Sequence, residues 1–181
     1  MAKAQKILLI GGPGTGKSTI INRLEQMGYH CLSEISREII LTAQKEGTEQ
    51  LFLTQPLRFS ELLLEGRIKQ HQKADQLAAN YVFIDRGIPD ITAYLDLARD
   101  KYPVLFDDAN VEYKYDQVFI LPIWEAIYIS DNERYEDLEE AKKIQQQLIK
   151  TYTQLGYDLI EVPKSSVEQR VEFILTNTQT N

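Results

Sequence analysis

Short apolar runs alternate with stretches of helical periodicity along most of this 181-residue chain. Five runs are rich in aliphatic and aromatic residues: 6–10, 29–32, 81–84, 116–121 and 157–162. Continuous short runs of this kind are typical of strands that are buried on both faces of a parallel sheet. The pattern therefore predicts five buried strands.

The intervals between these runs carry apolar residues at helical spacing. We expect helices over residues 20–27, 35–43, 56–79, 89–98 and 138–155. Gly28 is placed to end the first helix in a left-handed conformation, and Pro56 suits the first position of the third. Ser165 and Glu168 have capping-box spacing before a final helix. This alternation predicts a three-layer α/β/α sandwich around a five-stranded parallel sheet.

The length and the charge of the chain limit the number of domains and the kind of partner that we expect. A typical domain has about 100–200 residues, so we expect residues 1–181 to form a single domain. The chain carries 20 basic and 27 acidic residues, for a net charge of −7, which disfavours nucleic acid as a bulk partner. A small phosphorylated ligand is not excluded, because local basic residues can line a cleft.

Two further features bear on location. Cys31 is the single cysteine and cannot form an internal disulfide, and the apolar run 7–10 is not followed by a cleavage-site region. No stretch approaches the roughly 18 apolar residues that a membrane span requires. We therefore expect a cytoplasmic protein without a transmembrane segment.

The strongest motif follows the first expected strand. Residues 11–18 fit the pattern G-x-x-x-x-G-K-S/T in full, between a strand and a helix. Glycines let the backbone approach a phosphate closely, so that successive N–H groups and the helix N-terminus point at the anion. By chance, such a match arises in roughly one chain in a hundred of this length. We therefore expect ATP to be bound by Gly11, Gly12, Pro13, Gly14, Thr15, Gly16, Lys17, Ser18 and Thr19.

Each side chain of this loop suggests a specific role. Lys17 supplies a mobile positive charge for the β- and γ-phosphates, Ser18 a hydroxyl ligand for Mg²⁺, and Thr19 a contact to the α-phosphate. Asp85 follows the strand 81–84 and is expected at the sheet edge where α/β proteins bind ligands, so it is a second candidate for Mg²⁺. The alternative for Asp85 is a turn or helix-capping aspartate.

Several absences limit the kind of nucleotide chemistry. Arg86 stands directly after Asp85, where many motor-type and transporter-type ATPases have a water-activating glutamate. The chain contains no Asn-Lys-x-Asp or Thr-Lys-x-Asp to read guanine and no Leu-Ser-Gly-Gly-Gln. These absences favour a phosphotransferase, in which an acceptor takes the place of water.

With these motifs, the chain resembles the P-loop nucleoside and nucleotide kinases. More closely, it is similar to small AAA-type ATP-binding domains grouped with the ribosylnicotinamide kinase domain of bacterial NAD regulators. The resemblance covers nearly the whole chain. Its specific parts are residues 34–37, 85–90, 131–134 and 156–157.

The resemblance implies catalytic roles for three side chains besides Lys17. Glu34, after the second strand, occupies the place of the acid that orients or deprotonates the acceptor hydroxyl. Arg86 resembles the arginine of the Asp/Glu-Arg-Ser motif that contacts the acceptor, with Gly87 in place of the serine. Arg134 falls where a lid arginine, in a lid of about 122–137, would close over the triphosphate.

Each of these roles has a simpler alternative. Glu34 is also explained as a first-turn helix acid that the helix dipole favours, and Arg86 as a partner of Asp85 or Asp90. Arg134 stands among many acidic residues and is also explained as a solvated arginine at a helix start.

The remaining candidates are less specific. Segments 41–79 and 100–115 are expected to form helices and loops that cover an acceptor pocket, or only to pack on the sheet edge. Arg37, Arg58 and Arg67 have the charge to bind an anionic acceptor, but long polar helices carry such arginines routinely.

Together, these features predict an ATP- and Mg²⁺-dependent phosphotransferase that acts on a nucleoside, a nucleotide or a similar small hydroxyl- or phosphate-bearing acceptor. The alternative is a nucleotide-dependent switch or ATP-binding module with slow hydrolysis, which signals to a protein or an anionic lipid. The sequence leaves the acceptor and the oligomeric state open.

Overall fold

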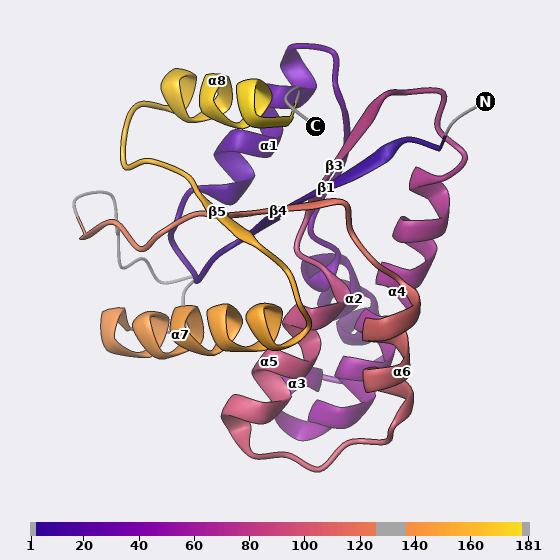
Figure 1. The fold of residues 1–181 in the computed structure, drawn as a ribbon. Helices are drawn as coiled ribbons and strands as arrows, with labels where there is room; N and C mark the ends of the chain where they lie inside the picture. The colour runs from indigo at the N-terminus through magenta and orange to yellow at the C-terminus, as the bar shows by residue number, and fades with distance from the viewer. Residues whose placement is uncertain (1–2, 126–136, 179–181) are drawn as a thin grey trace.

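A parallel sheet forms the centre of the molecule. The computed structural model describes residues 3–125 and 137–178. The sheet has five parallel strands in the order β2-β3-β1-β4-β5 (Figure 1). Their bounds are β1 (Gln5–Ile10), β2 (His30–Leu32), β3 (Tyr81–Asp85), β4 (Gln117–Ile120) and β5 (Leu159–Glu161). The predicted five-stranded parallel sheet is confirmed.

Helices cover both faces of this sheet. They are α1 (Lys17–Gln26), α2 (Ser36–Lys45), α3 (Leu51–Thr54), α4 (Pro56–Ala74), α5 (Ile88–Ala98), α6 (Leu105–Glu112), α7 (Leu138–Gln154) and α8 (Val167–Thr178). Helices α1 and α8 pack on one face, and α5 and α7 on the other (Figure 1). Helices α4 and α6 enclose a further apolar cluster with α5. The predicted three-layer sandwich is confirmed.

The central strand β1 shows why the sheet is buried on both faces. Ile7 and Leu9 pack with α1 and α8, whereas Leu8 and Ile10 point to the opposite face and pack with α5 and α7. All four side chains are 0% exposed. Burial of each contributes roughly 1.5–3 kcal/mol. The continuous apolar run is thus the sequence signature of a strand between two helical layers.

Helix α4 ends earlier than the sequence predicts, at Ala74 and not near Ala79. The carboxylate of Asp75, the residue after the helix, pairs with the buried ammonium group of Lys6 in β1. The first residue of β1 donates its N–H to the carbonyl of Asn80. These contacts hold the chain beside the start of β1, so residues 75–80 lead into β3 and do not extend the helix.

The cap of α8 also differs from the prediction. The Ser166 hydroxyl accepts the N–H of Gln169 at 3.3 Å, and the Ser166 N–H donates to the Gln169 side chain at 3.4 Å. The predicted pair Ser165–Glu168 is therefore wrong by one residue. Arg170, near the start of α8, is buried at 4% exposure.

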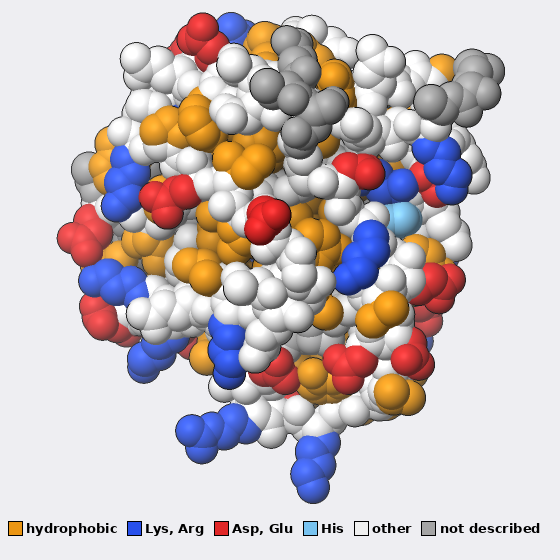
Figure 2. Space-filling view, viewed as in Figure 1, with side chains coloured by type: hydrophobic (Ala, Val, Ile, Leu, Met, Phe, Trp, Pro, Cys, Tyr) orange, Lys and Arg blue, Asp and Glu red, His pale blue; other side chains and the backbone are white. Residues whose placement is uncertain are grey.

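The surface carries charges of both signs. On the face shown in Figure 2, Lys and Arg side chains alternate with Asp and Glu and form no continuous basic area. Among the described residues, none of the helices combines the length and the apolar character needed to cross a bilayer.

Candidate functional site

The phosphate loop, residues 11–18, joins the carboxyl end of β1 to the start of α1. Gly11 has a φ of 149°, and a Cβ there would lie 2.6 Å from the carbonyl oxygen of Leu121. Gly16 has a φ of 87°, and a Cβ there would lie 2.9 Å from the guanidinium of Arg170. Both positions require glycine for backbone conformation and for space. Thr15 completes the loop, because its hydroxyl donates to the Gly12 carbonyl at 2.9 Å.

Lys17 is the first residue of α1, and its side chain folds back over the loop. Its Nζ donates to the carbonyl oxygens of Gly11 at 2.8 Å and Gly12 at 3.0 Å. Burial and the nearby Arg86 guanidinium lower the pKa of Lys17 to about 8, although neighbouring carboxylates oppose this shift. The ammonium group thus lacks full compensation by negative charge. An anion at the loop would supply it.

Two side chains from distant helices hold the loop from outside. Gln145 of α7 accepts the Gly12 N–H at 2.7 Å and donates to the Leu121 carbonyl at 3.3 Å. Arg170 of α8 donates to the Thr15 carbonyl at 2.7 Å. Sequence reasoning missed both residues, because their partners in the loop lie more than a hundred positions away in the chain.

Asp85 is the last residue of β3, next to Leu9 of β1. Its carboxylate is 3% exposed, and Oδ1 has no hydrogen-bond partner within the described residues. Burial raises the pKa of Asp85, although the nearby Lys17 and Arg86 lower it in part. An unpaired buried carboxylate oxygen beside a phosphate loop is a suitable ligand for a hard cation. The role of Asp85 as a magnesium ligand stays a prediction.

Magnesium fits this donor set. The Ser18 side chain, in the first turn of α1, is exposed. In the part of the chain that the structure describes, no group of three His, Cys, Asp or Glu side chains forms a complete metal cage. A cation held by Asp85 and Ser18 would need nucleotide or water oxygens as further ligands. This is the usual coordination of Mg²⁺ in nucleotide sites.

Glu34 lies after β2 at the centre of a charged cluster, which comprises Glu34, Arg67, Arg86 and Asp90. Its Oε2 pairs with Nε of Arg86 at 2.7 Å, and Oε1 lies 3.3 Å from the Arg67 guanidinium. Oε1 also accepts the N–H groups of Ile35 and Ser36 at 3.0 Å. Burial alone raises the pKa of Glu34, but the two arginines and the Ser36 N–H outweigh it, and the pKa is lowered. Glu34 is therefore a structural partner of the start of α2 and, at the same time, an ionised carboxylate.

Arg86 adopts a backbone φ of 68°, which is unusual for a residue other than glycine. Its NH1 lies 3.3 Å from both Asp90 Oδ1 and the Tyr94 hydroxyl. The side chain pairs with Asp90, as the simpler alternative expects, and also with Glu34, whereas its contact with an acceptor stays a prediction. A strained backbone that is held by several partners is typical of functional positions.

Of the three arginines that the sequence could not rank, Arg67 alone is buried, at 4% exposure. It lies on α4, and its NH1 donates to the Gly87 carbonyl at 2.6 Å. Arg58 is exposed and pairs with Glu61 one turn away, and Arg37 is also exposed. The structure therefore adds Arg67 to the candidate site.

Arg134 and most of the expected lid of about 122–137 lie outside the described residues. Asp137, which the structure does describe, caps α7 by accepting the Glu140 N–H at 2.8 Å. The role of Arg134 stays a prediction.

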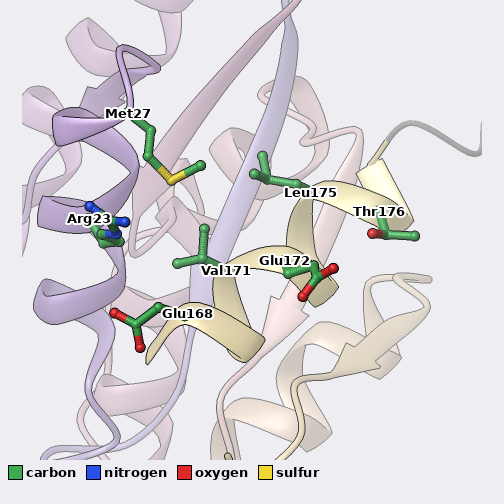
Figure 3. Close-up of a pocket in the computed structure, with 7 residues that line it drawn as sticks. All are labelled: Arg23, Met27, Glu168, Val171, Glu172, Leu175 and Thr176. Atoms are coloured by element: carbon green, nitrogen blue, oxygen red, sulfur yellow. The ribbon is translucent and has the colours of Figure 1, made fainter. Parts of the chain in front are cut away.

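Two cavities lie away from this site. One, of about 350 Å³, lies between α1 and α8, where Arg23 and Met27 face Glu168, Val171 and Leu175 (Figure 3). The other, of about 550 Å³, lies between α2, α3 and α4. Neither is lined by the phosphate loop or by the charged cluster.

Solved structures with the same fold include several kinases. A deoxyadenosine kinase from M. mycoides, with dCMP and dCDP bound, superposes with a TM-score of 0.71 at 21% identity, over 98% of this chain and 100% of its own. Thymidylate kinase from Candida albicans superposes with a TM-score of 0.64 at 20% identity, over 98% and 94%. These likenesses establish the fold.

NadR in complex with NR superposes with a TM-score of 0.75 at 15% identity, over 98% of this chain but only 52% of NadR. The chain thus spans about half the length of NadR. A search among curated proteins finds no match. A family model described as an AAA domain matches residues 6–170. The chain therefore belongs to this AAA domain family, with the fold of the P-loop nucleoside and nucleotide kinases.

Proposed function

We propose that this protein is an ATP- and magnesium-dependent phosphotransferase that acts on a small acceptor, such as a nucleoside or a nucleotide. One observation carries the proposal. At the carboxyl edge of the sheet, the phosphate loop and the unpaired Asp85 lie beside a charged cluster that contains Glu34 and Arg86. The first two fit Mg-ATP, and the cluster fits the recognition of an acceptor hydroxyl.

The phosphate loop would bind the triphosphate through its backbone N–H groups and the start of α1. The Lys17 ammonium would exchange the carbonyl oxygens of Gly11 and Gly12 for phosphate oxygens. Asp85 and Ser18 would hold Mg²⁺, which neutralises developing charge on the phosphates when it is bound.

The charged cluster would act on the acceptor. The acceptor oxygen would form a bond to the γ-phosphorus as the bond to the bridging β–γ oxygen breaks, and ADP would leave. The lowered pKa of Glu34 keeps its carboxylate ionised, so it can accept the proton of the acceptor hydroxyl. Arg86, released in part from Glu34, would then face the negatively charged phosphoryl group.

A second candidate function is a nucleotide-dependent switch with slow hydrolysis. The observation that favours it is the pairing of the Glu34 carboxylate, which already binds two guanidinium groups and two backbone N–H groups. A carboxylate so fully paired must lose a partner before it can accept a proton. In the switch, the loop would bind ATP while the cluster stays closed.

ADP release distinguishes these two functions. Purified protein is incubated with ATP and Mg²⁺, with and without a pool of nucleosides, nucleotides and vitamin-like hydroxyl compounds. We expect the pool to stimulate ADP release and Lys17→Ala to abolish it. Lys142→Ala, at a partly exposed lysine outside the loop, should retain it. Tight ATP binding without stimulation by any compound would instead support the switch.

A further inference from the structure

Gly87 stands where the Asp/Glu-Arg-Ser motif has a serine, and the structure gives the reason. Its backbone is extended, with φ of −113° and ψ of 177°, so any residue could adopt this conformation. A Cβ at this position, however, would lie 2.7 Å from Leu8 Cδ2, 2.8 Å from the Tyr152 hydroxyl and 3.0 Å from the Tyr115 ring. Gly87 is therefore required for space, and one of the groups that fill this space is the hydroxyl of Tyr152.

The Tyr152 hydroxyl has a defined partner. It donates to Asp90 Oδ2 at 2.6 Å, and both residues are almost fully buried, at 0% and 1% exposure. Burial and the neighbouring Asp90 raise the pKa of Tyr152 well above its ordinary value, so the hydroxyl keeps its proton and stays a donor. The same Asp90 oxygen also accepts the Gly87 N–H at 3.0 Å.

The other oxygen of Asp90 leads to the candidate site. Asp90 Oδ1 lies 3.3 Å from NH1 of Arg86, whose Nε lies 2.7 Å from Glu34. Asp90 and Glu34 therefore share one guanidinium. How strongly each carboxylate attracts this guanidinium depends on the other hydrogen bonds that the carboxylate accepts.

We propose that Tyr152 is a positioning residue, which satisfies Asp90 and thereby leaves Arg86 oriented toward Glu34. Asp90 Oδ2 accepts from the Tyr152 hydroxyl and from the Gly87 N–H. Without the hydroxyl, the Gly87 N–H would be left as its donor. The buried carboxylate would then draw Arg86 toward itself and away from Glu34. The kinetic consequence rests on the proposed phosphotransferase function, but the displacement of Arg86 does not.

The ring of Tyr152 has a separate, structural role. It packs in the core with Leu148 and Ile144 of α7 and with Leu8 of β1. Phenylalanine preserves this packing and removes only the hydroxyl. Tyr152→Phe therefore separates the two roles, and Tyr157→Phe is a matched control, because the Tyr157 hydroxyl accepts the N–H of Tyr115 and does not touch Asp90.

The first test follows the Nε–H resonance of Arg86 by nuclear magnetic resonance, with Arg86→Lys to assign it. It needs no acceptor and no turnover. We expect the resonance to shift in Tyr152→Phe and to stay in place in Tyr157→Phe. Gly87→Ala combined with Leu8→Val is a second variant in case Tyr152→Phe fails to fold. Leu8→Val removes the Cδ2 atom that the new Cβ would meet, so the Cβ can displace the hydroxyl from Asp90 and should move the same resonance, with Leu8→Val alone as its control.

A double variant tests whether the hydroxyl acts through Asp90. Asp90→Asn removes the charge that competes for Arg86, so adding Tyr152→Phe to it should move the Arg86 resonance no further. With an active acceptor, Tyr152→Phe should lower kcat about ten-fold, with the KM for ATP unchanged, and Asp90→Asn/Tyr152→Phe should be no slower than Asp90→Asn.

The outcomes of the two proposals are distinguishable. An Arg86 resonance that is unmoved in folded Tyr152→Phe, or in Gly87→Ala/Leu8→Val relative to Leu8→Val, overturns the positioning role, whatever the activity. A wild-type protein that phosphorylates no acceptor overturns the phosphotransferase and leaves the Arg86 test intact.

Discussion

The phosphate loop and the charged cluster lie at the same edge of the sheet but balance their charges in opposite ways. Lys17 is surrounded by the neutral carbonyls of Gly11 and Gly12, and burial lowers its pKa to about 8. Glu34, in contrast, is held by two guanidinium groups that keep its pKa below the ordinary value. The loop thus has uncompensated positive charge, whereas the cluster is neutralised from within.

This difference separates binding from chemistry. An anion can bind the loop without breaking an ion pair, because the bonds from Lys17 to the carbonyls are replaced by stronger, charge-assisted ones. Both oxygens of Glu34 are already paired, so we expect an acceptor hydroxyl that binds Glu34 to displace Arg67 or Arg86. We therefore expect nucleotide binding and acceptor phosphorylation to respond to different substitutions.

The largest expected effect is at Lys17. Lys17→Met keeps the length of the side chain but removes the charge that faces the transferring phosphoryl group. We expect acceptor-dependent ADP release to fall by about 10²–10³-fold. Steady-state kinetics measures this loss, with Lys142→Met, at a partly exposed lysine outside the loop, as the control. An equal loss in both variants would contradict the role of the loop.

Glu34→Gln breaks the cluster and leaves the loop intact. The glutamine can still accept the N–H groups of Ile35 and Ser36 but cannot act as a base, so kcat should fall by about 10²-fold or more. The dissociation constant for ATP, measured by calorimetry, should stay within about two-fold of the wild type. A comparable loss of ATP affinity would show that loop and cluster are not separable.

The pH dependence of ATP affinity tests the charge of the phosphate loop. ATP binds the protonated Lys17, whose pKa in the free protein is about 8. Affinity should therefore be nearly constant below pH 7 and fall by up to about ten-fold per pH unit above 8. Calorimetric titrations from pH 6.5 to 9.5 measure this slope, and Lys17→Met should abolish it.

The charged cluster makes the free energy of unfolding depend on pH. Because the pKa of Glu34 is lowered by folding, its contribution is present above the ordinary glutamate pKa of about 4.3 and is lost as pH falls through the folded value. The difference in unfolding free energy between wild type and Glu34→Gln should accordingly shrink below about pH 4. Denaturant titrations at pH 7 and pH 3.5 test this, and a difference independent of pH would refute it.

The smallest effect is expected at Gln145, which supports the loop from α7. Gln145→Leu leaves the Gly12 N–H without this acceptor, and ATP affinity should fall by about three- to ten-fold. The neighbouring Gln146 is exposed, so Gln146→Leu is a matched control. Equal affinities of the two variants would assign Gln145 no role in the loop.

The two regions also differ in how well the sequence predicts them. The phosphate loop is contiguous, and its glycines are required by the backbone, so the motif and its place between β1 and α1 are evident from residues 11–18 alone. The strands were predicted for a similar reason: burial on both faces leaves a continuous apolar run such as Ile7–Ile10. Local sequence determines both features.

The charged cluster is assembled from separate elements, and the sequence predicted only part of it. Glu34 and Arg86 were found through a family resemblance, but Arg67 was indistinguishable from Arg58, because both lie on the long helix α4. Tyr152 fits the apolar face of α7, and its hydroxyl meets Asp90 across 62 positions of chain. Such partnerships depend on helix packing, which periodicity does not specify.

The most direct test of the central claim follows the γ-phosphate itself. Phosphorus NMR of a reaction with ATP, Mg²⁺ and the acceptor pool shows whether the phosphoryl group becomes a new phosphate ester or free inorganic phosphate. The phosphotransferase predicts an ester signal that grows in step with ADP and is absent in Glu34→Gln. Inorganic phosphate as the sole product, or no turnover with bound ATP, would contradict it.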